Sequence, residues 1–335
     1  MNQNRIQQLL GAASGCNLLV IGDVMLDEFV WGRVSRISPE APVPVVEVVS
    51  ETCYPGGAAN VARNLVEFTP SVEVLGIIGN DLHGKRLKGL LHEERIGTSR
   101  VIESDKMPTI VKTRIIARQQ QVVRVDRERR FSGDDATFAA ILQMVRDALP
   151  TVTAIIFEDY GKGLITQALK DEVVSLCAGR DIIITVDPNP NNPLDWSGVT
   201  AIKPNRSEAF ASAGFPATEP DENPLYDKPL LAVGDILLDR WKVDHLLITL
   251  GEHGMLLLER GGEPHHIPTR AREVFDVSGA GDTAIAIFTL ALAAGANAME
   301  AAELSNLASG IVVGKLGTAT ITAPELLAAG YPPIP

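Results

Sequence analysis

The chain is poor in cysteine and has no grouping of histidines, which limits its metal and redox chemistry. Only three cysteines occur among 335 residues: Cys16, Cys53 and Cys177. Because their number is odd and they are far apart, the sequence predicts unpaired thiols in a reducing cytosol and no metal-binding pattern. The six histidines include no H-E-x-x-H motif. His265 and His266 are adjacent and in a strand would point to opposite faces, which argues against a shared metal.

The chain also lacks a surplus of positive charge. It has 30 Lys and Arg residues against 42 Asp and Glu residues, a formal net charge of −12. Nucleic acids and anionic membrane surfaces attract proteins with a basic face. The sequence therefore predicts small-molecule partners, with no nucleic acid and no membrane among them.

Long hydrophobic runs are absent. Residues 1–16 are of mixed polarity, and the apolar run at 18–21 is far too short for a signal peptide. The most apolar long segment, Ala284–Ala294, would form a helix of roughly 17 Å, whereas a bilayer core measures ~30 Å. With 45% apolar and 21% charged residues, the composition is that of a globular protein, and we expect it in the cytoplasm.

What the sequence does have is an alternation of short apolar runs with segments of helical period. This alternation is typical of a parallel sheet with crossover helices, so it predicts an α/β fold. Strands are expected at Leu18–Ile21, Val72–Ile78, Ala154–Phe157, Ile182–Val186, Thr200–Ile202, His245–Leu250 and Met255–Glu259. Helices are expected at Ala58–Phe68, Leu82–Arg95, Asp135–Leu149, Thr166–Ala178, Leu230–Trp241, Thr283–Ala294 and Ala298–Gly310.

Two regions, at about 28–49 and 109–126, break this pattern because they are β-rich and polar on one face. Such strands do not fit a sheet buried on both faces, so they predict a small antiparallel lid over one end of the domain. In the second region, Lys112, Arg114 and Arg118 fall on one side, with Arg124 beyond a turn at 119–121. This row of cations is either a solvated strand face or a site for an anionic group such as a substrate phosphate.

The stretch Asp276–Asp282 carries the strongest chemical signal. Two glycines, Gly279 and Gly281, precede an apolar helix with no breaker before Gly295. Small residues at a helix start allow backbone N–H groups to converge on an anion. A carboxylate at that point fits a transferring phosphoryl group whose acceptor loses its proton to Asp282.

The same stretch also fits the loose dinucleotide fingerprint G-x-G-x-x-A, with Glu300 about twenty residues on. That fingerprint requires the acidic residue at the end of a following strand, whereas here another helix follows. The segment from Gly79 to Arg86 is close to a phosphate-binding P-loop, but Arg86 stands where a magnesium-binding Ser or Thr is required. It is better explained as a strand-to-helix turn capped by Asp81.

Three polar groups follow other expected strands. Asp23 and Asp27 come after the first strand, where ligands bind in open α/β sheets, although Asp23 could simply cap the turn. The two glycines before Asn60 suggest close approach of a ligand, the alternative being tight helix packing. Asn205 and Glu208 are either oxygen ligands of magnesium or an N-cap and its partner in a capping box.

Taken together, these residues resemble the PfkB/ribokinase family of sugar kinases. Their order and spacing agree over nearly the whole chain. Val277 replaces a commoner threonine and leaves Asp282 in place. The resemblance is carried by Gly56, Gly57 and Asn60 for the first signature, by residues 276–282 for the second (usually D-T-x-G-A-G-D), and by Asn205 and Glu208 for an N-x-x-E magnesium motif.

The resemblance implies a single ribokinase-like domain over residues 1–335. Such a domain is a three-layer αβα sandwich with a mostly parallel central sheet and a small β lid. The implied cofactors are ATP and Mg²⁺, with a monovalent cation such as K⁺ in some relatives. A homodimer formed through the lid is implied as well.

The resemblance also implies roles for individual residues. Asp282 would be the general base, and backbone N–H groups of Gly279, Ala280 and Gly281 would hold the phosphoryl group. The other implied roles are sugar binding by Asp23, Asp27, Gly56, Gly57, Asn60, Asp159 and Lys162; binding of a sugar phosphate group by Arg114, Arg118 and Arg124; nucleotide binding by Asn205, Thr249, Gly251, Gly254 and Asn306; magnesium binding by Asn205 and Glu208; and monovalent-cation binding by Asp276 and the loop 314–318.

A narrower resemblance is to the D-glycero-β-D-manno-heptose-7-phosphate kinases. It implies ATP-dependent phosphorylation of the anomeric O1, which yields the 1,7-bisphosphate for ADP-heptose and the lipopolysaccharide core. Bifunctional relatives carry a nucleotidyltransferase with an H-x-G-H motif, which this sequence lacks, so no such domain is expected. A kinase for another sugar and a non-catalytic sugar- or nucleotide-binding regulator are the alternatives. The segments that carry this resemblance are 22–27, 35–45, 55–62 and 312–318.

Overall fold

The computed structural model describes residues 1–118, 120–270, 274–315 and 317–329. Its centre is a nine-stranded sheet in the order β13-β12-β11-β10-β9-β8-β1-β4-β5. Neighbouring strands are parallel except for the pairs β11·β12 and β12·β13. The strands are β1 (Asn17–Gly22), β4 (Ser71–Gly79), β5 (Gly97–Ser104), β8 (Ala154–Glu158), β9 (Ile183–Asp187), β10 (Ala201–Ile202), β11 (His245–Thr249), β12 (Met255–Glu259) and β13 (His265–Ile267).

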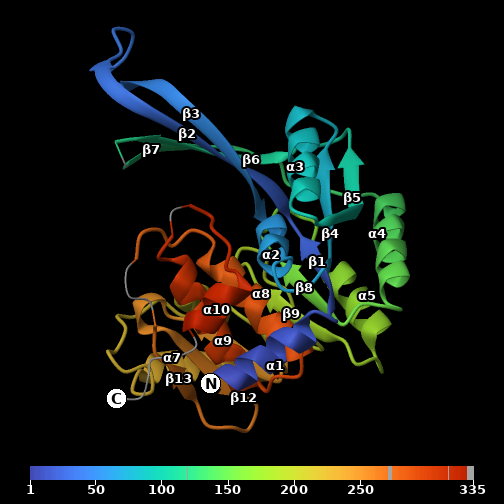
Figure 1. Ribbon diagram of the computed structural model, residues 1–335. Coiled ribbons are helices and arrows are strands. Elements are labelled where there is room, and N and C mark those ends of the chain that lie inside the picture. The colour runs from blue at the N-terminus through green and yellow to red at the C-terminus, as the bar shows by residue number, and fades with distance from the viewer. Residues whose placement is uncertain (119, 271–273, 316, 330–335) are drawn as a thin grey trace.

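Helices cover both faces of this sheet, which makes three layers (Figure 1). Alternate residues of β1 enter opposite cores, Leu18 and Val20 on one face and Leu19 and Ile21 on the other. The first face carries α1 (Gln3–Ala13), α2 (Ala58–Leu65), α3 (Leu82–Glu93), α8 (Ala280–Ala293), α9 (Ala298–Val312) and α10 (Ala323–Ala329). The second carries α4 (Asp135–Ala148), α5 (Gln167–Cys177), α6 (Arg206–Ala213) and α7 (Lys228–Trp241).

The predicted α/β fold is confirmed, and each expected strand and helix is present within a few residues of its predicted bounds. Asp81 caps α3 by accepting a hydrogen bond from the Gly84 N–H at 2.8 Å, as the strand-to-helix turn required. The elements β5, α1 and α10 were not among those expected, whereas β13 contains His265 and His266, as suggested, and α6 begins at the helix start suggested by Asn205 and Glu208. β5 is an edge strand of the sheet, where one side faces no neighbour and the apolar signal is weak.

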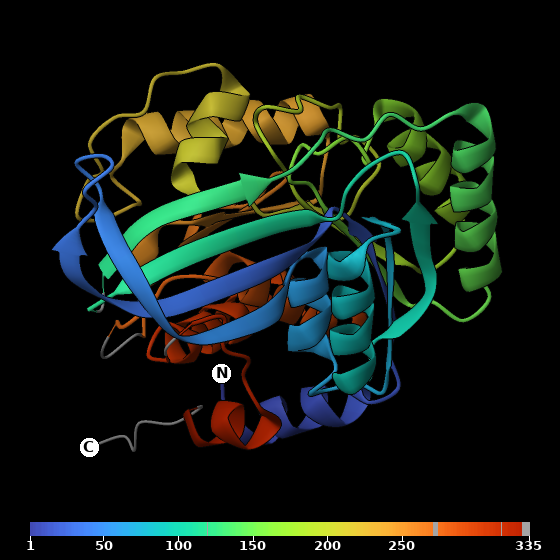
Figure 2. The same ribbon diagram turned by 90° about the horizontal axis from the view of Figure 1, so that it is seen from above.

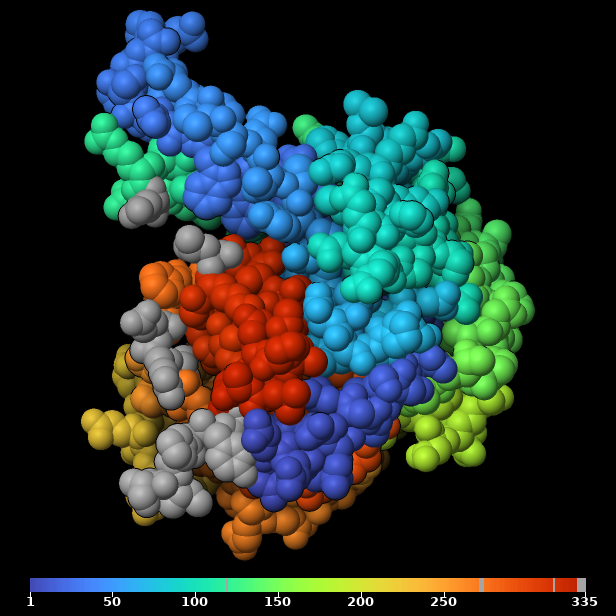
Figure 3. Space-filling model, viewed as in Figure 1, coloured from blue at the N-terminus to red at the C-terminus, as the bar shows by residue number. Residues whose placement is uncertain are grey.

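The lid is a separate four-stranded sheet in the order β3-β2-β6-β7. It projects beyond the body, with open space under its outer part (Figure 3), and seen from above it crosses the domain beside α2 and α3 (Figure 2). The first hairpin, β2 (Val24–Ile37) and β3 (Pro44–Gly57), extends beyond its expected region. The second, β6 (Ile110–Ala117) and β7 (Gln120–Arg127), matches its expected region within one residue.

Two details of the predicted lid were wrong. It is not purely antiparallel, because β2 and β6 pair in parallel. Each of them is the outgoing strand of its own hairpin, so the two run side by side in the same direction. Arg118 does not continue the row of cations, because β6 ends at Ala117 and Arg118 lies in the following turn with φ of +49°. Part of the predicted turn, Gln119, lies outside the described residues.

No helix among the described residues has the length and apolar character needed to span a bilayer. The cysteines Cys16, Cys53 and Cys177 are free thiols.

Candidate active site

Several strands of the parallel sheet end at one place, and their carboxyl ends build the floor of the site. Asp23 follows β1, Glu158 ends β8, Asp187 ends β9 and Lys203 follows β10. Ligands of open α/β sheets bind at this edge, because parallel strands all present their carboxyl ends there. The start of α8 packs against the same edge.

Helix α8 begins at Ala280, three residues before its predicted start, and its N-cap is a glycine in a conformation that other residues rarely adopt. Gly279 is the N-cap and has φ of +82°. The N–H groups of Gly279 and Gly281 have no hydrogen-bond partner in the described part of the chain, whereas that of Ala280 donates to the Val277 carbonyl at 3.2 Å. Two of the three predicted N–H groups are therefore open to an anion at a helix N-terminus.

Asp282 lies in the first turn of α8 and is held by two donors from other elements. Asn60 donates its side-chain N–H to Oδ2 at 2.7 Å, and Tyr160 donates its hydroxyl to Oδ1 at 3.2 Å. Asp282 is only 8% exposed. Burial raises the pKa of Asp282 to about 6, because its effect is larger than the lowering of the pKa by the two donors and by Lys203. A carboxylate with such a pKa is ionised at neutral pH and a better base than an ordinary one.

Two further carboxylates stand beside Asp282. One oxygen each of Glu158, Asp187 and Asp282 lies within 4.8 Å of the others. Burial raises the pKa of Asp187 to about 7, although Lys203 donates to its Oδ2 at 2.8 Å. Burial also raises the pKa of Glu158, whose buried Oε2 has no hydrogen-bond partner in the described structure. Oxygen donors grouped in this way suit a hard cation such as Mg²⁺.

Asp23 and Asp159, both predicted to bind sugar, hold the loop that follows β8. Oδ2 of Asp23 accepts the backbone N–H groups of Tyr160 at 3.1 Å and Lys162 at 2.9 Å. Asp159 accepts from the Gly161 N–H and from the side chain of Asn192, each at 2.8 Å. These contacts place Tyr160 against Asp282, and a sugar-binding role for the two carboxylates stays a prediction.

The carboxylate of Asp27 on β2 lies against Gly56 on β3, at the root of the lid, although Asp27 is in register with Tyr54. A Cβ at Gly56 would overlap the Asp27 carboxylate, so only glycine fits there. Gly57 has φ of +60° and ends β3, which places Asn60 in the first turn of α2. Asp27 is buried and pairs with the guanidinium of Arg114 on β6.

Four of the five residues predicted for the nucleotide line one cavity of about 400 Å³ beside the start of α8, and Asn205 is not among its lining residues. Its position next to the open N–H groups suits a nucleotide whose phosphates reach the helix N-terminus. The predicted residues that line it are Thr249, Gly251, Gly254 and Asn306, together with Ala280 and Gly281 of the anion site.

The predicted cation ligands are engaged with the backbone in this structure. Asn205 and Glu208 form a reciprocal capping box at the start of α6, with bonds of 2.8 and 2.9 Å. Asp276 accepts from the Ser278 N–H at 2.9 Å and from the Gly317 N–H at 3.2 Å, which joins it to the loop 314–318. Leu316 of that loop lies outside the described residues. Cation binding at both places stays a prediction.

Sequence reasoning missed Tyr160 and Lys203 as parts of the site. Lys203 directly follows the expected strand at 200–202, and Tyr160 lies three residues after the end of the expected strand at 154–157. That position was the signal that could have identified them. Their partners, Asp282 and Asp187, are distant in the chain, so no local pattern connects them. The structure brings together Asp282, Asn60, Gly279 and Gly281 at the helix start, and Asp27, Gly56 and Arg114 at the root of the lid.

Comparison with known proteins gives a consistent result. Residues 17–326 match the pfkB family of carbohydrate kinases. The "Bifunctional protein HldE" of Geobacter sulfurreducens is 39% identical over 327 residues, which is 98% of this chain and 65% of that protein. The protein of the same name from Caulobacter vibrioides is 41% identical over 317 residues, 95% of this chain and 64% of that protein. The chain thus spans just under two thirds of the length of these relatives.

Solved structures share the fold. The ribokinase of Arabidopsis thaliana in complex with ribose and ATP superposes with a TM-score of 0.70 and 18% identity, and covers 94% of this chain and 99% of the ribokinase. Phosphofructokinase-2 of Escherichia coli in complex with potassium superposes with a TM-score of 0.76 and 17% identity, and covers 94% of this chain and 98% of the phosphofructokinase chain. The nine-stranded, mostly parallel sheet with its flanking helices is a ribokinase-like fold.

Proposed function

The chain belongs to the pfkB family of carbohydrate kinases, and on that basis we propose that it transfers the γ-phosphoryl group of ATP to O1 of D-glycero-β-D-manno-heptose 7-phosphate. The main support for a phosphoryl transfer is the environment of Asp282. This buried carboxylate, with a pKa of about 6, stands beside open N–H groups at a helix N-terminus and next to the cavity of about 400 Å³. The narrower choice of heptose phosphate rests on the sequence resemblance and on the cations of the lid.

In the proposed reaction, the sugar O1–H bond and the bond between the γ-phosphorus and the ADP oxygen break, and an O1–phosphorus bond forms. Asp282 accepts the O1 proton, while Asn60 and Tyr160 fix the orientation of its two oxygens. The N–H groups of Gly279 and Gly281 donate to the transferring phosphoryl oxygens.

Magnesium fits this site on the evidence of its donors. Glu158 has an unpartnered buried oxygen, and Asp187 lies beside it at the edge of the sheet. We propose that these oxygens, with Glu208 and Asn205, hold Mg²⁺, which would neutralise charge on the phosphates. A monovalent cation between Asp276 and the loop 314–318 is proposed on the weaker ground that the two segments touch.

A substrate panel tests the function. ADP release would be measured with heptose 7-phosphate, the same heptose without phosphate, ribose, fructose and fructose 6-phosphate. We expect the highest kcat/KM with heptose 7-phosphate. A higher kcat/KM with another sugar would make that sugar the substrate. Absence of ADP release with every one of these sugars would contradict the proposed sugar kinase activity.

We also propose that two copies of the chain associate through the outer face of the lid. The face opposite Asp27 and Arg114 carries β-branched residues in register on three strands, Val30, Ile115 and Val123. Val123 is 46% exposed, and its neighbour Val125 is 52% exposed. Apolar rows of this kind on a projecting sheet mark protein contacts.

Sedimentation velocity tests the association. We expect the wild-type chain to sediment as a dimer and Val123→Glu to sediment as a folded monomer, because a buried unpaired charge is costly. Val43→Glu, an equally exposed change in the turn between β2 and β3, is the control and should stay dimeric. A monomeric wild type would contradict the proposal.

A further inference from the structure

Helix α2 carries a buried arginine that has no part in the reaction described above. Arg63 lies in the last turn of α2, and its side chain is only 10% exposed. Taking a guanidinium out of water is costly unless its N–H groups find partners. The partners of Arg63 should therefore show why a cation is buried at this position.

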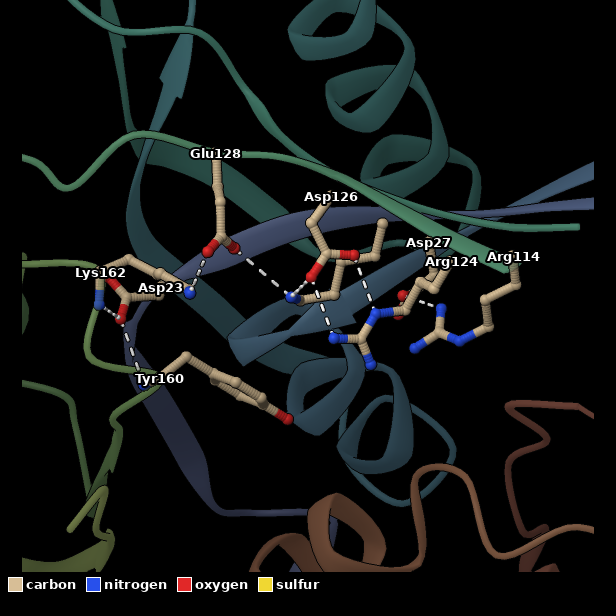
Figure 4. Close-up of polar contacts among 9 residues, drawn as sticks. Asp23, Asp27, Arg114, Arg124, Asp126, Glu128, Tyr160 and Lys162 are labelled. Atoms are coloured by element: carbon tan, nitrogen blue, oxygen red, sulfur yellow. Dashed lines mark hydrogen bonds and ion pairs between the residues drawn. The ribbon is translucent and has the colours of Figure 1, made fainter. Parts of the chain in front are cut away.

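Arg63 contacts three segments that are distant from one another in the chain. Its Nε pairs with Glu94 at the end of α3 at 3.1 Å, and its Nη1 donates to the backbone carbonyl of Thr318 at 2.9 Å. The guanidinium also lies 5.5 Å from the centre of the Tyr54 ring, a distance at which a cation is attracted to an aromatic face. Tyr54 belongs to the root of the lid, where it is in register with Asp27, which is drawn in Figure 4.

The ion pair with Glu94 does not by itself explain the burial of Arg63. Glu94 is 37% exposed, and a pair with so exposed a carboxylate contributes little to stability. The hydrogen bond to the Thr318 carbonyl, in contrast, is buried. The contact that requires a buried donor is therefore the one with Thr318.

Thr318 lies against the anion site at the start of α8. A Cβ built on Gly279 would lie 3.8 Å from Cγ2 of Thr318 and 2.9 Å from Nδ2 of Asn60, so these two side chains flank the N-cap glycine. The neighbour of Thr318, Gly317, donates its N–H to Asp276 at 3.2 Å. This short segment packs on the glycine whose N–H is open, so its position affects where that N–H points.

Helix α2 supports the base and the anion site from one side. Asn60 and Arg63 are three residues apart, which makes them neighbours on the surface of the helix. Asn60 donates to Asp282 at 2.7 Å, and Arg63 donates to Thr318 at 2.9 Å. One side chain of the helix thus fixes the base, and the other fixes the segment that packs on Gly279.

We propose that Arg63 is a positioning residue for phosphoryl transfer: its hydrogen bond to the Thr318 carbonyl holds the segment 317–318 against Gly279 and so fixes the N–H groups that receive the phosphoryl group. The inference rests on the function proposed above and concerns the anion site, whichever sugar is the acceptor. Because the same guanidinium lies against Tyr54, the root of the lid and the anion site share one support.

The first test replaces Arg63 by methionine, which keeps an unbranched apolar stem and removes the donors. Arg63→Met should lower kcat by about 10- to 100-fold, because a misplacement of about 1 Å can cost about 10²-fold in rate. KM for the sugar should change by less than about threefold, since the sugar-binding groups stay in place. Arg100→Met is the control: Arg100 is 17% exposed and pairs with Glu73 at 2.7 Å on the edge strand β5. It should leave kcat and KM within about twofold of the wild type.

Two further variants separate the bond to Thr318 from the ion pair. Glu94→Gln removes the anionic partner and leaves the donor to Thr318, so kcat should stay within about twofold. Arg63→Lys keeps a charge beside Glu94, but a single ammonium group does not serve two partners as the guanidinium fork does. Its kcat should fall by about 10-fold while thermal unfolding shows a folded protein. Wild-type kcat in Arg63→Lys, or an equal loss in Glu94→Gln and Arg63→Met, would overturn the proposal.

A binding measurement tests the anion site without a sugar. Aluminium fluoride bound beside ADP mimics a transferring phosphoryl group, so calorimetric titration would compare the affinity for ADP with and without it, in the presence of Mg²⁺. We expect aluminium fluoride to tighten ADP binding by the wild type. Arg63→Met should lose about tenfold of that gain, the range for a misplaced charge-assisted contact, and bind ADP alone as the wild type does.

The outcomes distinguish this inference from the proposed function. If the gain depends on Arg63 and no sugar is turned over, the positioning role stands and the sugar kinase activity falls. If Arg63→Met keeps the full gain, the kinase function stands and the role of Arg63 is refuted. If the wild type shows no gain, the anion site and the role of Arg63 are refuted together.

Discussion

Replacing Asp282 by asparagine should lower kcat by roughly 10²–10⁴-fold, the usual contribution of a positioned general base. Asparagine keeps the shape of the side chain and can still accept from Asn60, which donates to Asp282 at 2.7 Å. It cannot take a proton from the sugar hydroxyl. ATP binding should be unchanged, because Asp282 is not among the residues that line the cavity. Steady-state kinetics and ATP titration would measure the two effects, and turnover close to that of the wild type would remove Asp282 from the mechanism.

The pH dependence of the same variant provides its control. For the wild type, kcat/KM should fall below pH 6, since protonation of Asp282, with a pKa of about 6, removes the base. The residual activity of Asp282→Asn should lack this decline.

Asp282→Asn should lose activity but gain folding stability relative to the wild type. Burial raises the folded-state pKa of Asp282 from 3.8 to about 6. The folded state therefore binds the proton more tightly, and the contribution of this group to stability falls as pH rises from about 4 to above 6. Asparagine does not titrate, so the variant should gain stability relative to the wild type over that range, on the order of 3 kcal/mol by pH 7. Thermal unfolding at pH 4 and pH 7 would measure it.

Replacing Lys203 by methionine should destabilise the fold by about 3–5 kcal/mol at pH 7.5, the cost of leaving a buried charge without its partner. The side chain of Lys203 is 3% exposed and donates to Asp187 at 2.8 Å. Without it, Asp187 would face Glu158 and Asp282 with no cation between them. Urea unfolding of the two proteins would measure the difference.

A matched lysine shows whether burial is the cause. Lys88 pairs with Glu103 at 2.6 Å, but both side chains are exposed, at 39% and 44%. Lys88→Met should therefore cost less than about 1 kcal/mol. The cost of Lys203→Met should also shrink at pH 5, because burial raises the pKa of Asp187 and a protonated carboxyl needs no counter-charge. Equal costs for the two lysines would show that the buried pair is not essential.

Local patterns in the sequence were enough to predict the layers of the fold. The run Leu18–Ile21 is apolar throughout because its side chains enter both cores, and such a run identifies a buried parallel strand. Helix α8 is buried on all sides, as its continuous apolar run indicated. The edge strand β5 was missed, since five of its eight residues are polar and its apolar positions follow no clear period.

The lid shows where periodicity fails. Alternation along 111–118 predicted Arg118 on the face of Lys112 and Arg114, but the strand ends one residue earlier and a bulge follows Ile115. A change of one residue moves a side chain to another face, and nothing local in the sequence fixes where a strand must turn. Likewise, pairing of β2 with β6 joins two hairpins that are distant in the chain.

The sequence by itself was enough to predict the family of kinases, because each of its motifs consists of residues that are close together in the chain. For the same reason it was enough to propose an anion site at the start of α8 and Asp282 as the base. Only the tertiary structure decided the partners of these groups. Asn60 and Asp282 are 222 positions apart, and Tyr160 and Asp282 are 122 apart. Burial, which sets the pKa of Asp282, arises only when these distant elements pack. The contact of Lys112 with Asp126 is decided in the same way, by which strands lie side by side.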